Sequence, residues 1–152
     1  RAFDLLLAAI NRIWEKARKK EIEIEMDAED GLEEILILRD PKWLCESLIN
    51  VLDNAVKYSP VGSTVTIRAA TTVSFLRLEV KDEGIGIPRE NYHKVFQRFY
   101  RGVAPLVQKE EGSGVGLYLA RKIIEGHNGT ISLDARRMTK EPGSVFVIQL
   151  PL

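Results

Sequence analysis

The first part of the chain switches between two hydrophobic periodicities. Over residues 3–19 the apolar positions recur at intervals of three and four, which predicts an amphipathic helix. Over residues 22–26 isoleucine and methionine alternate with glutamate, a pattern typical of a half-buried strand with an acidic outer face. The apolar run at residues 35–38 predicts a short, more fully buried strand.

A second helix is predicted to begin at residue 41. Asp40 suits the N-cap position because its side chain can accept a bond from a free backbone N–H, and Pro41 suits the first helical position. The apolar stripe continues to about Tyr58, and the serine, proline and glycine within residues 59–62 end it.

The rest of the chain combines strands, loops and one more helix. Alternation predicts strands at 64–69, with Val65 and Ile67 directed inward, and at 75–80. The later elements are a glycine-rich loop at 82–88, a long polar loop at 101–114, a helix from Gly114 and Gly116 to about Gly126, a strand at 131–133, a charged hairpin at 134–143 and a last strand from Val145. This order predicts an α+β fold, a two-layer sandwich with helices on one face of a mostly antiparallel sheet.

Composition narrows the class of ligand. The 22 basic and 22 acidic residues cancel, so nucleic acid is not an expected partner and a phosphate ligand would need a local site.

The 152 residues fit one domain, and the single cysteine, Cys45, excludes an internal disulfide framework. No run of about 18 apolar residues is present. Because the chain begins at Arg1 without methionine and inside a helical pattern, we expect a fragment of a longer protein.

The first segment with candidate chemistry lies on the second helix. Asn50 and Asn54 are four residues apart, and Lys57 follows one turn later, so the three side chains share a helix face. Amide oxygens suit magnesium, and an ammonium group suits phosphate. The alternative is a solvated helix face without a ligand.

The second segment is the loop that begins at Asp82. Gly84 and Gly86 permit a close backbone approach that side chains would prevent. The Asp82 carboxylate accepts hydrogen bonds, so it matches the adenine amino group, whereas a guanine carbonyl would set acceptor against acceptor. The alternative is a simple turn.

The third segment places Phe96 and Phe99 beside Arg98 and Arg101. The two phenylalanines could anchor one end of a loop while the guanidinium groups stay available for phosphate. Simple core packing of both rings competes with this interpretation.

The fourth segment precedes the last helix. Gly112, Gly114 and Gly116 bring backbone N–H groups to a helix start, which favours an anion. The GxGxG spacing and the polar residues before it do not fit a dinucleotide fingerprint, and Leu117 stands where a P-loop needs lysine.

Together the four segments resemble the motifs of sensor histidine kinases. Residues 50–60 are similar to the N box, 82–86 to the first glycine box, 96–101 to the F box and 112–116 to the second glycine box. The resemblance spans essentially all of 1–152. It implies the Bergerat ATP-binding fold of type II topoisomerases and mismatch-repair ATPases, with about five strands, about three main helices and a long ATP lid. Residues 1–3 would be a remnant of the preceding connection.

The resemblance also implies roles for single residues. Asn54 would bind Mg²⁺, assisted by Asn50, and Asp82 would read adenine in ATP. Asn50 stands where ATP-hydrolysing relatives have a catalytic glutamate; an amide cannot act as a general base, so transfer to a protein acceptor is favoured over hydrolysis. Lys57 and Tyr58 would lie beside phosphate and nucleoside.

The remaining implied roles concern the lid, expected at about residues 88–114. Arg98 or Arg101 would clamp the γ-phosphate, and Phe96 would dock the lid. Other nucleotide contacts are expected at Gly84, Gly86, Ile87, Gly112, Ser113, Gly114, Val115, Gly116 and Leu117.

The phosphoacceptor histidine of the family has no counterpart, because neither His93 nor His127 lies in a suitable helical hairpin. The resemblance therefore implies a separate histidine-bearing dimerisation domain of the same protein as partner, and a response regulator receiver domain downstream. We expect this piece to be a monomeric cytoplasmic domain without self-phosphorylation, and the full-length protein to be a homodimer anchored in the bacterial membrane. The alternatives are a nucleotide-binding interaction module without transfer, and an anti-sigma-factor serine kinase, which would characteristically carry glutamate in place of Asn50.

Overall fold

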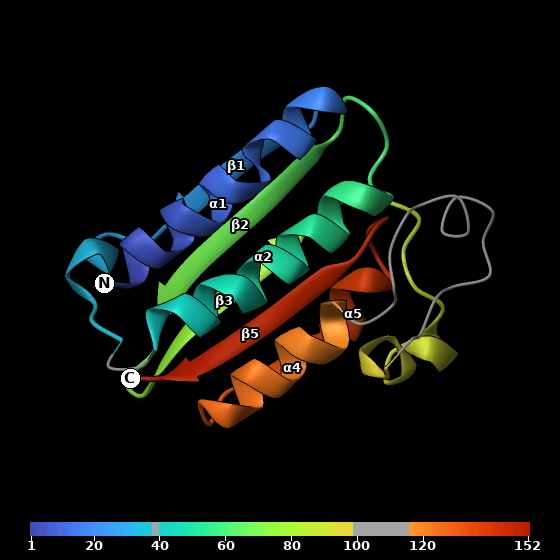
Figure 1. Cartoon of the computed structure of the whole chain (residues 1–152). Coiled ribbons are helices and arrows are strands. Elements are labelled where there is room, and N and C mark those ends of the chain that lie inside the picture. Colours follow the sequence, from blue (N-terminus) through green and yellow to red (C-terminus); the bar gives the residue numbers. More distant parts are fainter. Residues whose placement is uncertain (38–39, 99–115) are drawn as a thin grey trace.

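A computed structural model of the chain describes residues 1–37, 40–98 and 116–152 (Figure 1). Within these ranges, α1 (Ala2–Lys19) and α2 (Pro41–Tyr58) confirm the first two predicted helices. The Asp40 side chain accepts a hydrogen bond from the Lys42 N–H at 3.1 Å, and Pro41 occupies the first turn, as the capping pattern predicts.

Five strands form one sheet in the described part of the chain, in the order β1-β2-β3-β5-β4. They are β1 (Glu23–Ala28), β2 (Thr64–Thr71), β3 (Phe75–Lys81), β4 (Thr130–Leu133) and β5 (Val145–Pro151). β1 pairs with β2 in parallel because the crossover through α2 joins them, and the other neighbours are antiparallel. The predicted mixed, mostly antiparallel sheet is confirmed.

The helices α1, α2 and α4 (Gly116–Gly126) cover one face of this sheet, and the core lies between the two layers (Figure 1). Val65 and Ile67 point into that core, as their alternation predicts. The short helices are η1 (Leu32–Glu34), η2 (Arg89–Asn91), η3 (Lys94–Phe96) and α5 (Ala135–Met138). The predicted α+β sandwich is therefore correct.

Two local predictions need correction. No strand forms at residues 35–37, the described part of the predicted strand 35–38. The Ile35 carbonyl accepts a bond from the Ala2 N–H at 3.0 Å, and Leu36 is 58% exposed. The segment is bonded to the start of α1 instead of to a neighbouring strand. Ile35 and Ile37 pack against the core, partly buried, without sheet partners.

The second correction concerns residues 134–143. They connect the antiparallel strands β4 and β5, as a hairpin connection must, but they include the helix α5. The Asp134 side chain caps this helix by accepting a bond from the Arg137 N–H at 3.2 Å. Alanine, arginine and methionine are good helix formers, so the charged segment folds locally.

Candidate functional site

Asp82, directly after β3, is a buried carboxylate held by the backbone. Only 3% of the residue is exposed. Its Oδ1 accepts hydrogen bonds from the N–H of Gly84 at 2.9 Å and of Ser144 at 3.1 Å. Burial raises the pKa of Asp82 to about 6, against the opposing effect of these two bonds, and the nearby Glu83 charge adds to the rise. At neutral pH this side chain is therefore a preorganised hydrogen-bond acceptor.

Glycines allow the chain to close around Asp82. A Cβ on Gly84 would overlap the Tyr58 carbonyl oxygen and lie 2.9 Å from its carbon, so the loop packs against the last turn of α2. Gly143 has a φ of +92°, and a Cβ there would lie 2.8 Å from the carbonyl carbon of Asp82. Both positions exclude larger residues, because the neighbouring atoms belong to the backbone.

The loop then continues through two further predicted residues. Gly86 adopts a φ of +74°, which favours glycine, and Ile87 packs partly buried against the core. The structure thus brings the predicted first glycine box to the C-terminal end of α2.

The exposed stripe of α2 carries the predicted polar residues. Asn50, Asn54 and Lys57 are half-buried, between the fully buried positions of the helix. Lys57 Nζ lies 3.1 Å from Asp53 Oδ2, and Lys16 Nζ of α1 lies 2.8 Å from Asp53 Oδ1. One carboxylate therefore holds two ammonium groups on this helix face.

The last predicted glycine starts α4 beside the first asparagine. A Cβ on Gly116 would lie 3.9 Å from Asn50 Oδ1, and Leu117 packs partly buried against the core. Three of the four predicted segments thus meet along α2. The other residues predicted in the fourth segment, Gly112, Ser113, Gly114 and Val115, lie outside the described residues, as does Arg101.

Phe96 packs into the core at η3. Its ring meets Phe146 edge-on, with centroids 6.0 Å apart and planes at 85°, and the Arg121 guanidinium lies 5.5 Å from the ring centre. Arg98 is exposed, with its guanidinium carbon 5.8 Å from the Tyr118 ring centre. The packing interpretation is confirmed for Phe96, whereas Phe99 lies outside the described residues.

The described residues supply no acidic, histidine or cysteine cluster for a metal ion. A divalent cation at α2 would rely on the amide oxygens of Asn50 and Asn54 and on a ligand's phosphates, a hard-oxygen set that fits magnesium. His127 Nδ1 lies 2.8 Å from the Ile123 carbonyl oxygen, so this side chain caps the end of α4, and His93 is exposed before η3.

Sequence reasoning missed Ser144 and Gly143, which hold Asp82 from a segment 61 and 62 residues away. It also missed Asp53, which pairs with Lys57. The glycine and serine before the last strand were a weak signal of a turn. The pairing of β3 with β5 brings that turn to Asp82, where the Asp82 N–H donates to the Ser144 carbonyl oxygen at 2.9 Å.

Known proteins are similar to this chain in sequence. The family described as histidine kinase-, DNA gyrase B-, and HSP90-like ATPase matches residues 39–152. The sensor-like histidine kinase SenX3 of Mycobacterium tuberculosis is 36% identical over 143 residues, covering 94% of this chain. The chain spans about one third (33%) of the length of that relative.

Solved structures share the fold. The mycobacterial sensor histidine kinase MprB superposes with a TM-score of 0.80 at 31% identity, covering 96% of this chain and 95% of that one. Histidine kinase ThkA in complex with the response regulator protein TrrA gives a TM-score of 0.80 at 25% identity, covering 99% of this chain and 40% of that one.

Proposed function

Because this chain belongs to the histidine kinase-, DNA gyrase B- and HSP90-like ATPase family, we propose that the residues along α2 bind ATP and Mg²⁺ for transfer of the γ-phosphate to a histidine. Its sequence and fold are those of the ATP-binding catalytic domain of a two-component sensor histidine kinase, a transferase. The acceptor histidine lies on a separate dimerisation domain of the same protein. The buried, backbone-held Asp82 is the observation that carries the proposal.

Asp82 reads the base. Its carboxylate accepts a hydrogen bond from the adenine amino group, and burial strengthens that recognition because water cannot compete. The backbone at Gly84 and Gly86 lines the base, and the space of their missing side chains is taken by Tyr58 and Gly143, which holds the loop in place. Ile87 supplies an apolar neighbour. A guanine carbonyl at the same place would face the carboxylate with another acceptor, so the site selects ATP over GTP.

The polar stripe of α2 holds the triphosphate end. Asn54 binds Mg²⁺ through its amide oxygen with help from Asn50, and Lys57 and Tyr58 lie beside phosphate and nucleoside. Bound magnesium supplies charge neutralisation at the phosphates. The start of α4 at Gly116 and Leu117, with the preceding Gly112, Ser113, Gly114 and Val115, offers backbone N–H groups to the phosphates.

The chemistry needs little from acid–base groups on this domain. A neutral imidazole nitrogen attacks the γ-phosphorus with its own lone pair, the bond to the β–γ bridging oxygen breaks, and ADP leaves. Because Asn50 cannot deprotonate water, hydrolysis is disfavoured. Arg98 or Arg101 stabilises the transferring phosphoryl charge, and Phe96 anchors a lid of about residues 88–114.

The partners follow from this reaction. Besides ATP they are the histidine-bearing domain and the receiver domain of a response regulator, and the ThkA–TrrA complex supports the receiver domain as a partner.

No helix in the described ranges is long and apolar enough to cross a membrane. We propose that 1–152 is a monomeric cytoplasmic domain, and that the full-length protein is a homodimer anchored in the bacterial membrane.

Transfer in trans tests the proposal. The purified chain is mixed with a separately purified dimeric histidine-bearing domain of a sensor kinase and γ-labelled ATP. We expect acid-labile phosphohistidine on the added domain and none on this chain. ATP binding without transfer would favour a nucleotide-binding interaction module. Stable label on His93 or His127 would contradict the separate acceptor.

A further inference from the structure

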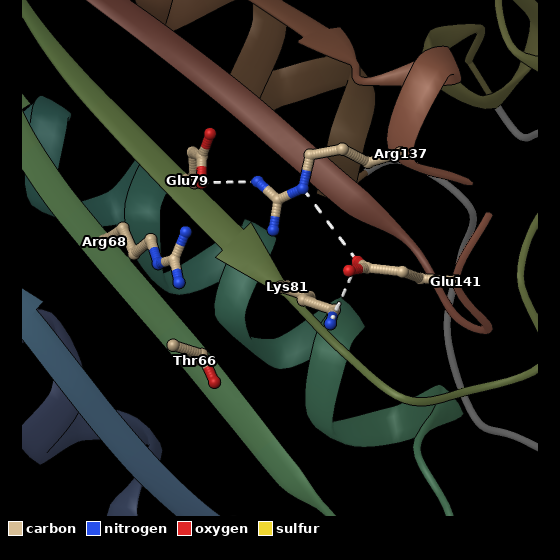
Figure 2. Close-up of a pocket in the computed structure, with 6 residues that line it drawn as sticks. All are labelled: Thr66, Arg68, Glu79, Lys81, Arg137 and Glu141. Atoms are coloured by element: carbon tan, nitrogen blue, oxygen red, sulfur yellow. Dashed lines mark hydrogen bonds and ion pairs between the residues drawn. The ribbon is translucent and has the colours of Figure 1, made fainter. Parts of the chain in front are cut away.

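The face of the sheet opposite α2 carries a charged pocket. Figure 2 shows side chains from β2, β3 and the segment that follows β4 converging there. The lining residues are Thr66, Arg68, Glu79, Lys81, Arg137 and Glu141. None of them belongs to the four segments assigned to nucleotide binding, so the pocket needs its own explanation.

One of the residues that line this pocket is a buried acid. The Glu79 side chain is only 8% exposed, and Arg137 Nη1 lies 2.7 Å from its Oε2. Arg77, on the same strand as Glu79, pairs with its other oxygen. Burial alone would raise the pKa of Glu79, but the bonds from Arg137 and Arg77 outweigh burial and lower the pKa below its usual value. The carboxylate is therefore charged and firmly held at neutral pH.

A second ion pair lines the same pocket. Lys81 Nζ lies 3.0 Å from Glu141 Oε2 (Figure 2). Arg137 Nε also approaches that carboxylate, at 3.9 Å, so the two pairs form one network. Each ion pair in a network costs less side-chain entropy than an isolated surface pair, because its side chains are already restrained by other partners.

The network joins the two segments that build the adenine end of the site. Lys81 immediately precedes Asp82, and Glu79 lies three residues before Asp82 on β3. Glu141 and Arg137 belong to the segment that leads into Gly143 and Ser144. Ladder pairing of β3 with β5 ends at Lys81 and Val145, and just beyond it the Asp82 N–H donates to the Ser144 carbonyl oxygen at 2.9 Å. Ser144 therefore lies between this strand pair and the α5 segment, and its position depends on both.

We propose that Arg137, acting through Glu79, is a positioning residue for adenine recognition, and that the Lys81–Glu141 pair is a second clamp of the same kind. The two pairs hold the Ser144 N–H against Asp82 Oδ1, so that the carboxylate keeps its orientation toward the base. Neither pair touches the nucleotide. This inference rests on the proposed function, since it assigns a role to groups behind the proposed adenine contact.

The first test compares two arginines on one acid. Arg137→Met removes the link between β3 and α5, whereas Arg77→Met removes a cation from the same Glu79 without breaking that link. Calorimetry of the full chain with ADP and with GDP measures affinity and base selectivity. We expect Arg137→Met to lower the affinity for ADP about 3- to 10-fold and to reduce the ratio of ADP affinity to GDP affinity. Arg77→Met should change both quantities by less than about 2-fold.

A charge exchange tests the second ion pair while Glu79 and its two arginines keep their identities. Lys81→Glu and Glu141→Lys each place like charges together, and we expect each substitution to lower the affinity for ADP. The double variant restores an opposite pair, so we expect it to regain most of the affinity. A purely structural surface pair would shift thermal stability without this loss and recovery of ADP affinity.

The outcomes separate the two claims. A parent chain that binds neither ADP nor ATP would overturn the proposed function. A parent that binds ADP, with Arg137→Met unchanged or no weaker than Arg77→Met, would overturn the positioning role while leaving nucleotide binding intact. If Arg137→Met does not fold, the exchange at Lys81 and Glu141 decides, and failure of the double variant to recover contradicts the proposal.

Discussion

The two ends of the proposed nucleotide site are built on different physical principles. At the adenine end, Asp82 is 3% exposed and fixed by backbone N–H groups. At the phosphate end, the side chain of Lys57 is 27% exposed and its partner Asp53 also pairs with Lys16, whose side chain is 61% exposed. Shape and burial define the first end, and partly exposed, paired charges on a helix define the second.

This difference predicts different sensitivities. A buried group in a closely packed loop tolerates almost no change in volume, and its ionisation is coupled to stability. Charges on a helix surface tolerate substitution, and their effects are screened by salt. Changes near Asp82 should therefore alter stability and base choice together, whereas changes on α2 should alter phosphate and metal binding alone.

The largest effect is expected for Gly84→Ala. The added methyl group would overlap the Tyr58 carbonyl, so the loop or the end of α2 must move. We expect a loss of about 3 kcal/mol in unfolding free energy, at the upper end for overpacking, together with loss of nucleotide binding. Gly126→Ala, where a Cβ has no heavy atom within 4 Å, is the matched control and should leave both nearly unchanged. Equal effects of the two substitutions would contradict the close packing of the loop at Gly84 against α2.

The next effect is a pH-dependent gain of stability in Asp82→Asn. The pKa of Asp82 is raised to about 6 in the folded chain from 3.8, so its favourable contribution is present below the lower value and is lost as pH rises through about 6. Asparagine does not titrate. Relative to the parent, we expect the unfolding free energy of the variant to gain about 1 to 2 kcal/mol between about pH 5 and about pH 8, measured by urea unfolding. A pH-independent difference would show that the carboxylate is not buried as described.

The same Asp82→Asn variant should lose its preference for adenine. The asparagine oxygen can replace Oδ1 for the backbone bonds, but its amide nitrogen would face the adenine amino group as a second donor. We expect a loss of about 1 to 2 kcal/mol in ATP affinity and near-equal binding of ATP and GTP, measured by calorimetry. Unchanged ATP affinity would refute the adenine assignment.

At the phosphate end, Asn54→Ala should weaken only the magnesium-dependent part of binding. Removing one oxygen ligand should lower ATP affinity about tenfold in magnesium, or about 1.4 kcal/mol, and leave affinity in chelator nearly unchanged. Asn11→Ala, on the exposed face of α1, is the control. Magnesium dependence that survives in Asn54→Ala would show that this residue is misassigned.

The smallest effect is expected for Lys16→Ala. The Lys16 side chain of the Lys16–Asp53 pair is exposed, so we expect its removal to lower the unfolding free energy by only about 0.2–1 kcal/mol, measured by urea unfolding. This difference should shrink in high salt, because salt screens the pair. Arg12→Ala, which breaks the longer pair with Glu46 at 3.6 Å, should cost no more. A larger, salt-insensitive cost would mean that the phosphate end also depends on buried packing.

Local patterns predicted most of the fold, because capping and periodicity act over a few residues. The start of α2 at Asp40 and the inward face of β2 are examples. The apolar run at 35–38 predicted a strand, but residues 35–37 bond to the start of α1 instead, and an apolar run alone cannot report such a tertiary contact.

The site was predictable only in its local parts. Asn50, Asn54 and Asp82 stand in recognisable segments, and the structure brings those segments to α2. Ser144 and the Arg137–Glu79 pair were not predictable, because they reach the site through the register of β3 and β5.

The central claim is that both ends serve one nucleotide, and amide NMR of the chain tests it most directly. Adenosine alone should shift the backbone N–H signals of Gly84 and Ser144. A magnesium-bound, non-hydrolysable ATP analogue should shift those signals and the side-chain amides of Asn50 and Asn54 with one common saturation curve. Separate saturation curves for the two groups, or no shift at Gly84 and Ser144, would contradict the account.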